Sequence, residues 1–326
     1  MHTFQLICIA CCYLPALIIE ILRRRSNSDF PDVCSQQTAS ETHSVSASFL
    51  TTVFLTLIGL IIQTLYLIGK IDLSANITPL SSLQGIMISA SWLMSLIFLA
   101  SLRRAYGTIF PILTMTASLC LILAAFWASD VQFSRQPVMR WWGLIHGLSQ
   151  LTFFVSLTVG LIVGILYLWQ DRRLKLRLSH GTWKLPPLER LARINRASLI
   201  WSLASLAPGI VSGFVLLNAR HGTISLADYA FSPTIIGSLI IFLWILWTII
   251  RSMAFGAFTE AKATARRTIF LFIVLTITLV SAYFSPLGHL SLQPSKDTET
   301  EATDSNAPQS ELNPARLPNE AKEAQQ

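Results

Sequence analysis

Eight long apolar stretches decide what this chain can fold into. Each is roughly 20 residues long, the length an α-helix needs to cross the hydrocarbon core of a bilayer. They are residues 4–22, 49–69, 83–102, 109–127, 148–169, 197–217, 233–250 and 268–284. Only 13% of the residues are charged, about half of the roughly 25% found in soluble domains. The sequence therefore predicts an all-α polytopic membrane protein whose eight transmembrane helices form one integral unit in the lipid bilayer.

Lys and Arg are unevenly distributed over the loops between these stretches. The loops after the first, third, fifth and seventh stretches contain 3, 2, 8 and 4 of them, against 1, 2 and 1 after the second, fourth and sixth. Basic loops stay on the cytoplasmic side. We therefore expect a protein of the plasma membrane (the inner membrane in bacteria) with both termini outside. The net charge of +7 reflects this bias, so no nucleic-acid partner is expected.

Several functional classes lack support in the sequence. No P-loop, HExxH or GxSxG motif is present, so we do not expect an enzyme. The second to eighth stretches contain no Asp, Glu, Lys or Arg, whereas ion-coupled carriers usually hold such groups at membrane depth. Three of the five cysteines, Cys8, Cys11 and Cys12, share the first stretch and are interpreted as small apolar residues.

Three histidines fall on the predicted outer side. His146 begins the fifth span, His221 lies between the sixth and seventh spans, and His289 follows the eighth. An imidazole is an axial ligand of haem iron, and aromatic side chains on the same side would provide an apolar bed for the porphyrin. An ordinary interfacial belt of aromatic residues with neutral histidines explains the same pattern. The aromatic residues are Trp127, Trp141, Trp142, Tyr229, Phe231 and Tyr283.

A series of motifs follows His146. The fifth span ends in YLWQDRR (167–173), and KLPPLERLARIN (184–195), PGIVSGF (208–214), SPTIIGSLIIFLWILW (232–247) and YFSPLGHLS (283–291) come after it. In order and spacing these motifs resemble the cytochrome c assembly family, which includes membrane proteins of the CcsA, CcmC and HemX types. The resemblance implies an assembly-like membrane domain in 83–289, which two further N-terminal transmembrane helices in residues 1–82 precede. Residues 290–326 are polar, acidic and proline-containing without apolar periodicity, which predicts a disordered tail.

The resemblance also implies a haem site on the outer face. His146 and His289 would ligate the iron, His221 being an additional candidate, and Phe231 and Tyr229 would line the gap. The family's tryptophan-rich WxWDP loop is replaced here by DYAFSP (228–233), which keeps an aromatic face without indoles or the carboxylate. The expected partners are a membrane protein of the cytochrome c synthase type and apocytochrome c.

The implied function is a component of cytochrome c biogenesis that binds or presents haem. Two alternatives stay open. One is a HemX-like protein that modulates haem biosynthesis without holding haem. The other is a small-molecule permease, which would need a polar path between helices, and the sequence shows little of one. Apolar residues at three-residue spacing after Pro186 and Pro187 also predict a short amphipathic helix over 188–195 that lies along the inner surface.

Overall fold

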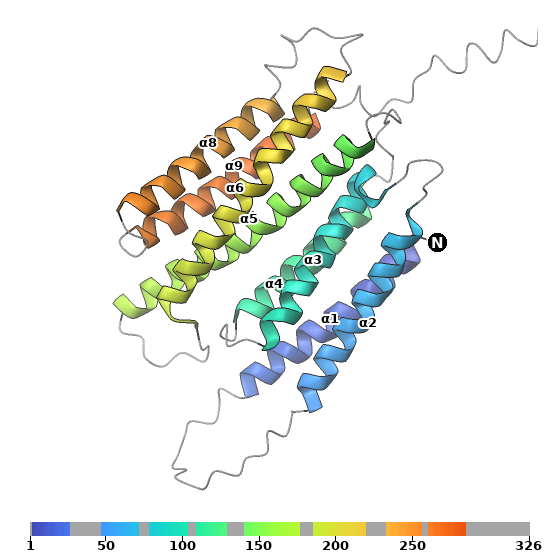
Figure 1. The fold of residues 1–326 in the computed structure, drawn as a ribbon. Coiled ribbons are helices and arrows are strands. Elements are labelled where there is room, and N and C mark those ends of the chain that lie inside the picture. The colour runs from blue at the N-terminus through green and yellow to red at the C-terminus, as the bar shows by residue number, and fades with distance from the viewer. Residues whose placement is uncertain are drawn as a thin grey trace, which may run out of the picture.

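The computed structural model describes residues 2–26, 47–71, 78–103, 109–128, 140–176, 185–219, 233–255 and 260–284. Within these ranges, long helices run side by side (Figure 1). They are α1 (His2–Ser26), α2 (Ala47–Gly69), the short 3-10 helix η1 (Pro79–Ser81), α3 (Leu83–Arg103), α4 (Ile109–Trp127), α5 (Arg140–Lys175), α6 (Leu188–Ala219), α8 (Pro233–Ala254) and α9 (Ala261–Phe284).

All eight predicted spans are helical, and the all-α membrane fold is confirmed. In the described ranges, eight helices are long and apolar enough to cross a membrane. The helix α4 ends where its apolar stretch ends, but α5 runs beyond the apolar stretch at both ends. Neither Gly nor Pro interrupts the polar turns between Trp169 and Lys175, and Lys175 pairs with Asp171 one turn earlier. Such a pair supports a helix.

The prediction of a separate surface helix over 188–195 is wrong in its placement. These residues are helical, but they are the first two turns of α6, which continues without a break into the sixth span. The backbone N–H of Leu191 donates to the Pro187 carbonyl at 3.2 Å, so the helix starts after the prolines as expected. Leu191 itself is only 1% exposed and belongs to the core cluster that contains Leu166 and Tyr167 of α5. Its burial holds this segment against α5.

Helix packing divides the structure into two groups. The helices α1 to α4 pack on one another, as do α5, α6, α8 and α9, and contacts of α5 with α3, α4 and η1 join the groups (Figure 1). Small residues allow close approach, as in membrane helix pairs generally; Gly59 of α2 faces Tyr13, and Gly164 of α5 faces the backbone of α9. The domain boundary at residue 83 stays a prediction, while packing places α3 and α4 with α1 and α2.

Candidate functional site

His146 lies in the second turn of α5 and is partly buried against α6. Its Nδ1 is 2.9 Å from the carbonyl oxygen of Gly209. A carbonyl oxygen can only accept a hydrogen bond, so Nδ1 carries the proton and donates it. In the neutral ring the lone pair is therefore on Nε2, so Nε2 is the ring nitrogen with the chemistry of a metal ligand in this tautomer. The position of His146 was predicted, but the hydrogen bond that selects its tautomer was not.

Two glycines of α6 allow close approach of α5, one beside the ring of His146 and the other beside Gln150. A Cβ atom on Gly213 would lie 3.1 Å from His146 Cε1 and 3.3 Å from Nδ1, and one on Gly209 would lie 3.1 Å from Gln150 Nε2. The Ser212 hydroxyl is 3.4 Å from Nδ1 but also lies 2.7 Å from the Pro208 carbonyl, to which it donates. The motif over 208–214 thus forms the surface of α6 that contacts His146.

The other predicted site residues lie outside the described ranges. They are His221, Tyr229, Phe231 and His289. The approach of His289 to His146 therefore stays a prediction. Trp141 and Trp142 are 70% and 39% exposed near the start of α5, where indoles commonly meet the membrane interface. In the described part of the chain, no group of three His, Cys, Asp or Glu side chains is placed to hold a metal ion.

A second polar feature runs through α1 to α4, and its arrangement was not evident from the sequence. The buried Tyr13 hydroxyl donates to Gln63 Oε1 at 2.8 Å, and Gln63 Nε2 donates to the Ile88 carbonyl at 2.8 Å. Buried Ser and Thr hydroxyls lie along the same four helices, and those of Thr52, Thr56, Ser101 and Thr114 donate to carbonyls of their own helix. We call this set of side chains the polar core; it consists of Tyr13, Thr52, Thr56, Gln63, Tyr66, Gln84, Ser91, Ser95, Ser101, Thr114 and Ser118, all buried.

Hydrogen bonds within the polar core link α2, α3 and α4. Ser118 Oγ of α4 is 2.9 Å from Ser91 Oγ and 2.7 Å from Ser95 Oγ of α3. Nearer the start of α3, Gln84 accepts from the Tyr66 hydroxyl and donates to the Ala125 carbonyl, both at 3.2 Å. Because side chains bond across helices, the polar core fixes the mutual register of α1 to α4.

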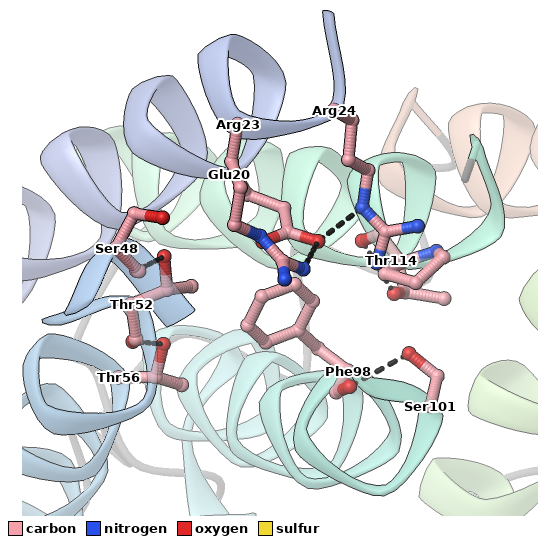
Figure 2. A network of polar contacts seen from close by, with 10 residues as sticks. Glu20, Arg23, Arg24, Ser48, Thr52, Thr56, Phe98, Ser101 and Thr114 are labelled. Atoms are coloured by element: carbon pink, nitrogen blue, oxygen red, sulfur yellow. Dashed lines mark hydrogen bonds and ion pairs between the residues drawn. The ribbon is translucent and has the colours of Figure 1, made fainter. Parts of the chain in front are cut away.

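A buried carboxylate closes the other end of the polar core. Glu20 of α1 is completely buried and accepts from Arg23 Nη2 at 2.8 Å and Nε at 3.0 Å; Arg24 Nε donates to the same carboxylate. Figure 2 shows the hydroxyl side chains of Thr52 and Thr114 on the helices around this ion pair. The signal was in the sequence, because acidic and basic residues three and four apart on a helix face each other.

No protein-family model, curated protein or solved structure matches the chain. The resemblance to the cytochrome c assembly family therefore rests on the motifs alone. The chain is a multi-pass membrane protein. A hydrogen bond to the backbone selects the tautomer of His146 near one end of α5, and the polar core runs through α1 to α4.

Proposed function

We propose that this protein binds haem at the outer end of α5 through His146 and presents it during cytochrome c biogenesis. One observation carries the proposal: the hydrogen bond from His146 Nδ1–H to the Gly209 carbonyl. Histidines that ligate metals generally donate their other ring N–H to a carbonyl or carboxylate, which orients the ring and raises the basicity of the ligating nitrogen. Nε2 of His146 would then meet the iron.

The remaining parts of the proposal come from the resemblance. His289 would supply the second axial ligand, with His221 as the alternative, and Tyr229 and Phe231 would contact the porphyrin. Haem itself is the group that a synthase-type partner would join to the cysteines of apocytochrome c. The protein's own task is to bind, orient and release it, which requires no nucleophile or general acid.

An absorption spectrum tests the proposal directly. The full chain, purified in mild detergent from cells with ample haem, should show a Soret band typical of two histidine ligands. His146→Ala and His289→Ala should each abolish six-coordinate haem, while His180→Ala, in the predicted cytoplasmic loop, serves as the control. A colourless wild-type protein would refute haem binding and leave the HemX-like role without bound haem. A spectrum unchanged in His146→Ala would refute this ligand.

Two variants on α6 test whether the orientation of the His146 ring controls haem binding. Gly213→Ala brings a methyl group to 3.1 Å from the imidazole, so the ring must shift and haem affinity should fall about ten-fold, as for loss of an outer-shell partner. Ser212→Ala removes a hydroxyl that bonds to its own helix and should change affinity little. Equal affinities for the two variants would mean that ring orientation does not control binding.

A small-molecule permease is the second candidate, because the polar core reaches from Gln84 to the level of Glu20. Several of its groups bond across helices, such as Tyr13 to Gln63 and Ser91 to Ser118, as groups that fasten membrane helices do, so conduction would require these pairs to part. Proteoliposomes containing a pH-sensitive dye test whether the polar core conducts protons or only fastens the helices together. With Glu20→Gln reconstituted as a folded, monodisperse species, a faster proton leak in the wild type would favour a polar path through the polar core, and equal leak would assign the polar core to helix packing.

A further inference from the structure

Two arginines meet one tryptophan where α8 ends and α9 begins. The guanidinium carbon Cζ of Arg267 lies 4.7 Å from the centre of the Trp247 ring, and that of Arg251 lies 5.5 Å from it. Arg251 follows Trp247 by one turn of α8, so the two side chains share a face, while Arg267 reaches the ring from α9. Cation–π attraction therefore holds two positive charges beside one indole.

The carboxylate beside these arginines balances only part of their charge. One oxygen of Glu260 lies 3.4 Å from Arg251 Nη2, and the other lies 3.1 Å from Arg267 Nη1 without hydrogen-bond geometry. Lys262 forms its own pair with Asp171 of α5 at 2.8 Å. Among the described residues, two guanidinium groups thus share one carboxylate, which leaves one positive charge unbalanced.

This arginine pair lies where the membrane span of α8 ends. The span extends to Ala254, within one turn of Arg251. Trp247 is exposed on the bundle surface, and so is Phe255, whose ring centre lies 5.1 Å from Arg251 Cζ. The Arg251 side chain is 38% exposed, against 17% for that of Arg267. Arg251 can therefore be reached from the bilayer, at the level where the hydrocarbon core gives way to lipid headgroups.

We propose that Arg251, supported by the charge of Arg267, binds the phosphate of an anionic phospholipid in the leaflet on the predicted cytoplasmic side. A guanidinium group matches the geometry of phosphate oxygens, and basic pockets between membrane helices on that side bind acidic headgroups. Arg251 Nε is covered by protein, so the contact is made by the terminal nitrogens of this side chain.

The charge and position of the site select an anionic lipid over other phosphates. A zwitterionic headgroup would bring an ammonium group to a site that already has an unbalanced positive charge. A dissolved phosphate would leave Trp247 and Phe255 uncovered, whereas the acyl chain of a lipid can pack against them. The site does not involve His146, so a colourless protein leaves this proposal unchanged.

Photo-crosslinking tests the site in the full-length protein reconstituted in phosphatidylcholine nanodiscs. The probe is phosphatidylglycerol with a diazirine near the carbonyl end of one acyl chain. Peptide mass spectrometry should find labelling at Trp247 and Phe255 that saturates as the probe fraction rises. A phosphatidylcholine probe with the same diazirine should label them only in proportion to its amount. Labelling of Ile277, exposed on α9, should not saturate with either probe, and inorganic phosphate should not displace the phosphatidylglycerol probe.

Three variants assign the saturable labelling to the charges of the site. Arg251→Gln should lower the apparent affinity about ten-fold, as for loss of a hydrogen bond between charged groups. Arg193→Gln, which changes an exposed arginine of α6, should leave it unchanged. Glu260→Gln removes the competing carboxylate and should raise the affinity about five-fold, the effect of one charge near the membrane surface. Loss of folding would lower labelling in both site variants, so opposite signs separate binding from stability.

The proposal is overturned by labelling that rises without saturation, or by equal saturation with the phosphatidylcholine probe. Equal affinities of folded Arg251→Gln and Arg193→Gln overturn it as well, as does an unchanged or lower affinity in Glu260→Gln. The Glu260→Gln result decides the matter if Arg251→Gln does not elute as a monodisperse species. Displacement of the probe by inorganic phosphate would reveal a site for a dissolved anion and overturn the lipid assignment.

Discussion

Gly59→Ala tests whether the polar core depends on close packing of α1 against α2. A Cβ at Gly59 would lie 2.3 Å from Tyr13 Cε1, 2.8 Å from Cδ1 and 3.2 Å from the Cβ of Cys12. Tyr13 is completely buried, and its hydroxyl is held by Gln63. The ring therefore cannot turn aside without losing that hydrogen bond, and the helices must separate instead.

The expected magnitude follows from three contributions. Overpacking a well-packed site costs about 1–3 kcal/mol. Loss of one interhelical hydrogen bond in a membrane protein costs about 0.6–1.7 kcal/mol. Replacing a mid-helix glycine by alanine returns about 1 kcal/mol of helix propensity. We expect the free energy of unfolding to fall by about 2 kcal/mol.

Gly69→Ala is the matched control, because it lies on the same helix with no atom within 4 Å of its added Cβ. Denaturant or thermal unfolding in detergent, followed by tryptophan fluorescence, should separate the two variants. In a Tyr13→Leu background the clash is absent, so Gly59→Ala should lose most of its effect. Equal stability of Gly59→Ala and Gly69→Ala, or strict additivity with Tyr13→Leu, would refute the packing described here.

Three further outcomes are expected. Glu20→Gln leaves two guanidinium groups without their buried carboxylate and should lower the free energy of unfolding by about 3–5 kcal/mol. Glu189→Gln, in an exposed pair with Arg193, should change it by under about 1 kcal/mol, and similar losses in the two variants would show that the Glu20 pair is solvated. Leu191→Ala should cost about 2–5 kcal/mol, because the side chain is buried; a negligible cost would restore the surface-helix prediction. In a cysteine-free background, Thr182→Cys should react with an impermeant maleimide only after the membrane is opened, and labelling of intact cells would invert the predicted topology.

Hydrophobic length predicted the fold well, because each span must be apolar over the bilayer thickness whatever its neighbours are. It could not predict where helices end outside the membrane. Polar turns after Trp169 and before Ala197 continue α5 and α6, and contacts such as that of Leu191 hold them there. Those contacts join residues far apart in the chain, so local periodicity did not reveal them.

The candidate site, like the fold, could be predicted from the sequence only in part. Residue type and position made His146 a candidate ligand, which stays a prediction, but its tautomer depends on Gly209, which lies 63 residues away. The arrangement of the polar core was not predicted, because the Tyr, Gln, Ser and Thr side chains that form it are distributed over four helices. Each of them looks unremarkable in its own apolar stretch, and only the packing of α1 to α4 brings them together.

The uninterrupted length of α5 has a mechanical consequence. Its 36 residues extend about 54 Å at 1.5 Å per residue, well beyond the roughly 30 Å of hydrocarbon. His146 lies near one end of this helix. Asp171, which pairs with Lys262 of α9 at 2.8 Å, lies near the other end. Because one uninterrupted helix joins these two positions, a rigid-body tilt of α5 would displace both of them at once, and a displaced Asp171 would disturb its ion pair with α9.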